Sequence, residues 1–124
     1  MVTQKKLLVV DDDEILLDMY KERLQMSGYD VTAVTNGSAA LKQVEKLMPD
    51  VILLDIMMPK ISGFDVLKKL KDNDKTKNIP VIILTALSQE NNRKQGMQMG
   101  ASDFIIKAET MPKDVVAKIE KFIK

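Results

Sequence analysis

Four short apolar runs in the sequence are each followed by a side chain that can do chemistry. The side chains are Asp11, Asp12 and Asp13 after the first run, Asp55 after the second, Thr85 after the third and Lys107 after the fourth. Where apolar strands run parallel, their carboxyl ends lie at one edge of the sheet. The four runs would therefore bring carboxylates, a hydroxyl and an amine together.

Several carboxylates held close together repel one another, and a proton or a cation relieves the repulsion. The chain has no cysteine and no histidine, so the available ligands are oxygen atoms. Oxygen ligands favour Mg²⁺ or Mn²⁺, which keep bound waters and accept phosphate oxygens. With Asp55 as nucleophile, Thr85 bonding a phosphoryl oxygen and Lys107 balancing charge, this pattern predicts a phosphoryl-transfer site.

Each of these residues also has a purely structural interpretation. Acids at 11–13 suit the start of a helix, where they favour the helix dipole. Asp55 suits a turn, Thr85 suits a strand end or a cap, and Lys107 suits an exposed surface. The coincidence of all four at strand ends favours the phosphoryl-transfer interpretation.

The hydrophobic pattern alternates between strands and helices. We predict strands over 5–10, 29–34, 51–54, 80–84 and 103–106, and helices over 14–27, 38–48, 63–71, 88–98 and 112–123. In the first helix the apolar positions include Ile15, Met19, Leu24 and Met26, and the fourth helix is the weakest because it is polar and contains Gly96. Five βα units predict an α/β, flavodoxin-like (βα)5 fold. Its five parallel strands would lie in the order 2-1-3-4-5, with helices on both faces.

Composition narrows the class of protein further. A chain of 124 residues, 45% hydrophobic and 30% charged, suits one domain with a real core. The net charge of +1 is too mixed in sign to indicate nucleic-acid binding. No apolar run approaches the length of about twenty residues that spans a membrane. The absence of cysteine fits a reducing cytoplasm.

The segments LLVVDDDEILL, VILLDIMMPKISGFDVLKKL, IPVIILTA and GASDFIIKA resemble the response-regulator receiver domains of two-component signalling. The resemblance covers nearly the whole chain, and a chemotaxis regulator of this family is a known example of the 2-1-3-4-5 order. It implies one receiver domain over 1–124, without an output domain. It also implies a switch rather than an enzyme, one that assists its own phosphorylation and slow dephosphorylation.

The resemblance also implies a role for each site residue. Asp55 would be the phospho-acceptor, and Mg²⁺ would be held by Asp12 directly, by Asp11 partly through water, by Asp55 and by the backbone carbonyl of Met57. Asp13 would be an extra acid beside the pair Asp11 and Asp12. Thr85 and Phe104 would be the switch residues, and Lys107 would contact the phosphate.

One position departs from the family pattern. The family commonly has a proline after the lysine, joined to it by a cis peptide, whereas here Ala108 follows Lys107. A cis peptide before a residue other than proline costs about 2.5–4 kcal/mol. We therefore expect a trans bond, or a cis bond with visible strain.

The partners implied are a histidine kinase or histidine phosphotransfer protein as phosphodonor, since this chain has no histidine of its own. A downstream protein would bind the face made by the fourth helix, fifth strand and fifth helix, where Lys113, Lys118 and Lys121 favour an acidic partner. The domain would be a monomer or a weak, phosphorylation-dependent dimer.

Three alternatives stay open. An aspartate-nucleophile phosphatase would need a second acid where Met57 stands. A degenerate, binding-only receiver would never take phosphate. A flavin-binding protein would need a phosphate loop, rich in hydroxyls and glycine, after the first strand.

Overall fold

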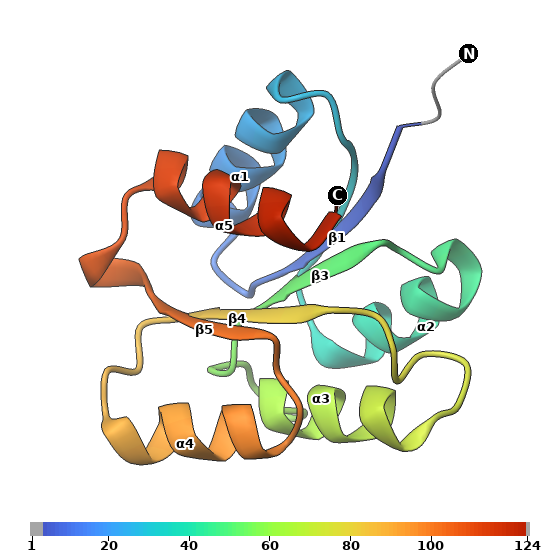
Figure 1. Ribbon diagram of the computed structural model, residues 1–124, viewed down its shortest axis with the longest axis vertical. Coiled ribbons are helices and arrows are strands. Elements are labelled where there is room, and N and C mark those ends of the chain that lie inside the picture. The colour runs from blue at the N-terminus through green and yellow to red at the C-terminus, as the bar shows by residue number, and fades with distance from the viewer. Residues whose placement is uncertain (1–3, 124) are drawn as a thin grey trace.

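The computed structural model describes residues 4–123, which form a parallel sheet covered by helices on both faces (Figure 1). The strands are β1 (Lys6–Val10), β2 (Asp30–Val34), β3 (Val51–Leu54), β4 (Val81–Thr85) and β5 (Asp103–Ile106). The helices are α1 (Glu14–Met26), α2 (Gly37–Leu47), α3 (Gly63–Asp72), α4 (Glu90–Gln98) and α5 (Pro112–Ile123), with a short 3₁₀ turn η1 (Lys107–Glu109) before α5. The predicted bounds agree with these to within two residues.

The sheet has the order β2-β1-β3-β4-β5, as predicted from the sequence. β1 pairs with both β2 and β3, and the last residues of β1 and β3 are directly paired, Val10 with Leu54. Because the next residue on each strand is an aspartate, this register alone brings Asp11 and Asp55 side by side. The edge strands are β2 and β5.

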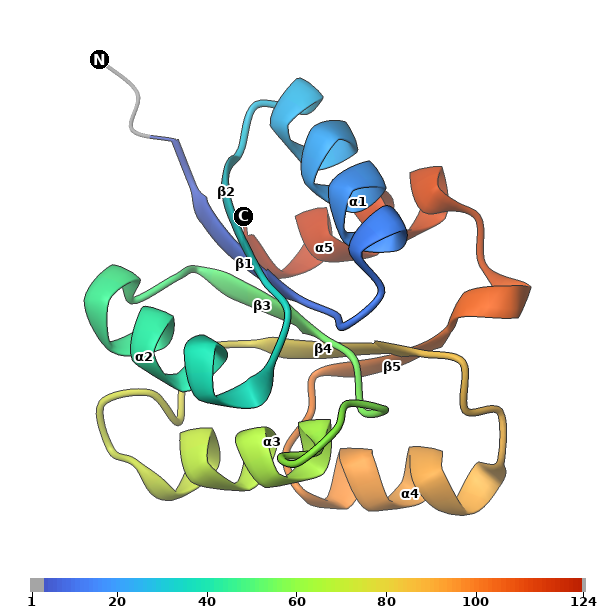
Figure 2. The same cartoon turned by 180° about the vertical axis from the view of Figure 1, so that it is seen from behind.

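Two hydrophobic layers hold the helices against the sheet. One face is covered by α1 and α5, and the other by α2, α3 and α4, as Figures 1 and 2 show from opposite sides. Both layers include strand residues with almost no exposure, such as Leu8 and Ile52 in one and Ile82 in the other. The site at the strand ends therefore stands on strands that are buried on both faces. Within residues 4–123, no helix combines the length and apolar character needed to cross a bilayer.

The inner face of α1 differs from what its apolar positions suggested. Leu17, Tyr20 and Leu24 face the sheet, at the spacing of three and four residues that defines one helical face. Ile15 and Met26 lie off this face and are 84% and 82% exposed. An apolar residue at helical spacing is thus not always a core residue.

Helix α4 approaches the sheet through a glycine. Gly96 is the buried residue of this helix, and a Cβ there would lie 2.8 Å from Cδ1 of Ile83 and 3.3 Å from Cδ2 of Phe104. The helix also lacks a side-chain hydrogen bond at its first cap, Gln89. Gly96 therefore weakens the helix by propensity, as the sequence indicated, but it also allows a close approach that a larger residue would prevent.

Candidate functional site

Three carboxylates meet at the carboxyl edge of the sheet. Oxygens of Asp11, Asp12 and Asp55 all lie within 4.8 Å of one another. Asp11 and Asp55 are each only 4% exposed, whereas Asp12 faces solvent. Two buried acids and one exposed acid make a site that is closed toward the core and open on one side.

Lys107 joins the two buried carboxylates. Its Nζ donates to Oδ2 of Asp11 at 2.7 Å and to Oδ2 of Asp55 at 3.0 Å. The other oxygen of each acid accepts a backbone N–H: Asp13 donates to Oδ1 of Asp11 at 2.9 Å, and Met57 donates to Oδ1 of Asp55 at 3.1 Å. Both carboxylates are therefore held at both oxygens, which fixes their orientation.

Lys107 reaches this position through an ordinary backbone. The structure has no cis peptide bond within residues 4–123, so Lys107 and Ala108 are joined in trans. Lys107 follows β5 directly and opens the short turn η1. Of the two alternatives expected for this bond, the structure has the trans bond, and Nζ of Lys107 still points to Asp11 and Asp55.

The charges of the site perturb one another. Burial raises the pKa of Asp11 above its ordinary 3.8, against the hydrogen bond from Lys107, and the nearby charge of Asp55 adds to the increase. Burial alone would lower the pKa of Lys107, but its hydrogen bonds to Asp11 and Asp55 outweigh this and raise it. One ammonium against two buried acids leaves a net negative charge, which favours a further cation.

The donor set suits a hard divalent cation. Carboxylate oxygens and backbone carbonyls are the ligands of Mg²⁺, which also keeps several waters. Asp12 is exposed and Met57 is 52% exposed, so the open side of the site has room for such waters. The residues present therefore fit Mg²⁺ or Mn²⁺, with Asp11, Asp12, Asp55 and the Met57 carbonyl as the expected ligands.

The loop after β3 is shaped around Asp55. Lys60 adopts a left-handed φ of 68°, and Ser62 and Asp65 form a reciprocal capping box that starts α3. Gly63 donates its N–H to the carbonyl of Ile56 at 2.9 Å. A Cβ at Gly63 would lie 2.3 Å from the carbonyl oxygen of Asp55, so only glycine fits there without moving the acceptor.

Thr85 lies at the carboxyl end of β4, and Phe104 lies earlier along the neighbouring β5, where it pairs with Ile83. Thr85, the last residue of β4, is fully buried, and its hydroxyl accepts the N–H of Leu87 at a long 3.4 Å. Phe104, on β5, is 2% exposed and packs into the space left by Gly96. The ring is therefore inside the molecule in this structure. The switch roles of these two residues stay predictions.

Two contributions to the site were missed in the sequence. Asp13 does not join the cluster as an extra acid: its side chain caps α1 by accepting the N–H groups of Ile15 and Leu16. The sequence signal was its place just before a helix, where aspartate is a preferred cap. Gly63 was not identified either, because a close backbone approach between distant residues leaves no local pattern.

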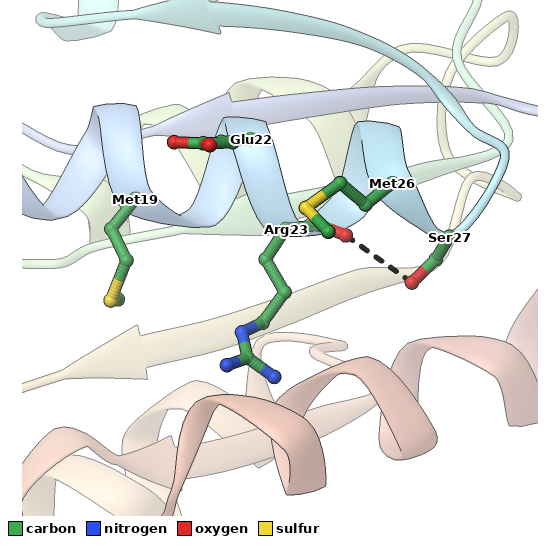
Figure 3. Close-up of a pocket in the computed structure, with 5 residues that line it drawn as sticks. All are labelled: Met19, Glu22, Arg23, Met26 and Ser27. Atoms are coloured by element: carbon green, nitrogen blue, oxygen red, sulfur yellow. Dashed lines mark hydrogen bonds between the residues drawn. The ribbon is translucent and has the colours of Figure 1, made fainter.

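A hollow at the surface lies away from the carboxylates. It has a volume of about 530 Å³, lies beside α1 and is lined by Met19, Glu22, Arg23, Met26 and Ser27. Figure 3 shows Arg23 extending toward α5, and the hydroxyl of Ser27 donating to the carbonyl of Arg23 at 3.2 Å. The hollow contains none of the site residues, so the chemistry is assigned from the carboxylate geometry.

Comparisons with known proteins identify the family of the chain. The profile of the response regulator receiver domain matches residues 7–120. The alkaline phosphatase synthesis transcriptional regulatory protein PhoP of Bacillus subtilis is 37% identical over 97% of this chain and 49% of its own length. The response regulator PleD of Caulobacter vibrioides is 43% identical over 82% of this chain and 22% of its own length.

Solved structures give the same result. The chemotaxis protein CheY4 of Vibrio cholerae has a TM-score of 0.90 at 28% identity, covering 97% of this chain and 99% of that one. The BeF3-activated N-terminal receiver domain of Klebsiella pneumoniae RstA has a TM-score of 0.89 at 28% identity, covering 97% and 99%.

The chain spans between about a fifth and about half of the length of the curated relatives named above. The absence of an output domain therefore stays a prediction. The region that matches the family, residues 7–120, contains the residues of the carboxylate site. The chain belongs to the response regulator receiver domains, the phosphorylation-dependent signalling modules of two-component systems.

Proposed function

We propose that Asp55 accepts a phosphoryl group from a phosphohistidine on a partner kinase or phosphotransfer protein. The observation that carries this proposal is the pair of buried carboxylates bridged by one amine, with Asp55 held at both oxygens. A nucleophile fixed in this way needs little reorganisation to attack. The domain would thus be a switch that is charged by another protein.

In the proposed reaction, an oxygen of Asp55 attacks phosphorus in line with the bond from phosphorus to the donor nitrogen. That bond breaks, the imidazole leaves with its electron pair, and an aspartyl phosphate forms. Lys107, freed from Asp55 Oδ2, donates to a phosphoryl oxygen and balances its charge. When bound, Mg²⁺ would supply further charge stabilisation for the phosphoryl oxygens.

We propose that phosphorylation is read on the face made by α4, β5 and α5. Thr85 and Phe104 link the site to this face, and Gly96 packs directly on the Phe104 ring. Movement of the Thr85 hydroxyl toward the phosphoryl group would alter the packing of this ring and of α4. Amide exchange with and without beryllium fluoride and Mg²⁺ would then change over residues 85–112, whereas changes confined to the site residues would argue against this face.

The central experiment is intact mass after incubation with a small phosphodonor and Mg²⁺. We expect the wild type to gain at most one phosphoryl group and Asp55→Asn to gain none. Asp12→Ala, or excess chelator, should abolish labelling. A wild type that takes no phosphate would support the binding-only alternative. Continuous turnover of a phosphate ester would support the phosphatase alternative.

A further inference from the structure

We infer that Asp13 is a positioning residue for the cation site, acting through its geometry and not through its charge. This inference rests on the proposed function of the site. Asp13 makes two kinds of contact at once. Its side chain caps α1, and its backbone N–H holds Asp11, so one residue connects the first turn of the helix to a buried acid of the site.

The hydrogen bonds form a continuous path. Oδ1 of Asp13 accepts the N–H of Ile15 at 3.1 Å and that of Leu16 at 3.3 Å. The N–H of Asp13 donates to Oδ1 of Asp11 at 2.9 Å. The two helix donors fix the extended backbone of Asp13, with φ −84° and ψ 101°, and this backbone aims its N–H at Asp11.

The bond to Asp13 decides which atoms of Asp11 face the site. With Oδ1 held by the N–H of Asp13, Oδ2 turns toward Lys107 and Asp55. If the cap were lost, the Asp13 backbone could rotate, and the side chain of Asp11 would lose one of its two restraints. Groups that orient a metal ligand in this way typically change metal affinity by about 10- to 100-fold.

The charge of Asp13 is a weaker explanation. Within residues 4–123, the carboxylate cluster comprises Asp11, Asp12 and Asp55, without Asp13. The Asp13 carboxylate is exposed and already accepts two N–H groups. Water and salt screen an exposed charge, so its direct attraction for a cation is small compared with that of the two buried acids.

The chain provides a matched control at another helix. Asn36 caps α2 by accepting the N–H of Ala39 at 2.8 Å. It is the same kind of cap, but among the hydrogen bonds within residues 4–123 none joins the backbone N–H of Asn36 to Asp11 or Asp55. Loss of either cap should lower the melting temperature by about 4 °C, from the typical worth of one cap.

The experiment compares Asp13→Ala, Asp13→Ser, Asp13→Asn and Asn36→Ala with the wild type. The full chain is titrated with Mg²⁺ by calorimetry, which suits a protein without tryptophan. Amide exchange of residues 15 and 16 in metal-free protein reports the cap itself. Serine and asparagine keep the cap without the charge, so they separate position from electrostatics.

We expect Asp13→Ala to weaken Mg²⁺ binding by about 10-fold and to speed exchange at residues 15 and 16. Asp13→Ser and Asp13→Asn should stay within about threefold of the wild type, since an exposed charge is largely screened. Asn36→Ala should bind Mg²⁺ normally despite its lower melting temperature.

Three results would overturn the inference. If Asp13→Ser, Asp13→Asn and Asp13→Ala all weakened Mg²⁺ binding equally, the charge of Asp13 would be responsible. If Asp13→Ala bound Mg²⁺ as tightly as the wild type, Asp13 would not position the site. Equal weakening in Asn36→Ala would reduce the effect to general stability. If the wild type itself binds no Mg²⁺, the proposed cation site fails together with this inference, whereas wild-type binding with any of the three results removes the inference alone.

Discussion

Gly63→Ala is the substitution for which the structure makes the sharpest prediction. The new Cβ would lie 2.3 Å from the carbonyl oxygen of Asp55 and 2.6 Å from the Cα of Ile56. Both are backbone atoms, which cannot rotate away as a flexible side chain can. The loop after β3, or the end of β3 itself, would have to move, and Asp55 would move with it.

The size of the effect follows from this overlap. The Cβ falls about 0.7 Å short of the closest approach that real Cβ atoms make, and such overpacking costs typically about 1–3 kcal/mol. Alanine regains at most about 1 kcal/mol through its better helix propensity. Because the overlap is with backbone atoms, we expect a cost at the upper end of this range and a net fall in the free energy of unfolding of about 2 kcal/mol. Phosphorylation of Asp55 should slow because its carboxylate is displaced.

The assay is urea denaturation of the metal-free protein, together with the rate of labelling by a small phosphodonor. Gly37→Ala is the matched control, because Gly37 also opens a helix but its Cβ would meet the side chain of Ile61 at 2.9 Å. The contacts at Gly37 are side-chain atoms of Ile61 and Val66 rather than backbone atoms, so the control should lose less stability than Gly63→Ala and keep its labelling rate. Equal stability and labelling in Gly63→Ala and the wild type would refute the reasoning.

Three further predictions concern Lys107, the residues that flank the phosphoryl position, and the packing of α4. Lys107→Met leaves two buried acids without their amine, so the free energy of unfolding in chelator should fall by about 3 kcal/mol and Mg²⁺ should restore much of it. Lys118→Met is the control: it breaks a more exposed pair, with 3.6 Å between Nζ of Lys118 and Oδ2 of Asp103, and should change the free energy of unfolding little. If Mg²⁺ stabilised the wild type and Lys107→Met equally, the idea that Lys107 and the cation neutralise the same two acids would be wrong. Met57→Asn and Leu87→Glu should each speed hydrolysis of the aspartyl phosphate, because an attacking water would gain a polar group that orients it. Intact mass over time measures the loss of the phosphoryl group, and unchanged or slower loss in both variants would count against this prediction. Gly96→Ala should push α4 away from the sheet and speed amide exchange over 90–98, and exchange as slow as in the wild type would mean that the close approach is not needed.

The sequence predicted the parts of the fold that depend on local pattern. Continuous apolar runs identified the central strands, and residues such as Val115 and Ile119 identified the inner face of α5. The chirality of βα units limited the possible strand orders, and the order 2-1-3-4-5 was also the one that the resemblance to receiver domains implied. Parallel strands then placed Asp11, Asp55, Thr85 and Lys107 at one edge. The structure confirms this order and brings Asp11, Asp55 and Lys107 into contact.

The rest depended on contacts that only the folded chain creates. Gly63 matters because its backbone approaches Asp55, and Gly96 because α4 lies on Phe104; neither contact is encoded in neighbouring residues. Asp13 looked like one more acid because charge is visible in a sequence and hydrogen-bond direction is not. Ile15 was an apolar position of the first predicted helix, and only the register of α1 in the folded chain shows that it lies in solvent.

The central claim is that Asp55, among several neighbouring aspartates, forms the acyl phosphate. After labelling with a small phosphodonor and Mg²⁺, hydride reduction converts the phosphorylated aspartate to homoserine, and peptide sequencing by mass spectrometry locates it. We predict homoserine at position 55 alone in the wild type, and none anywhere in Asp55→Asn or in chelator. Homoserine at position 11, 12 or 13, or its persistence in Asp55→Asn, would contradict the account.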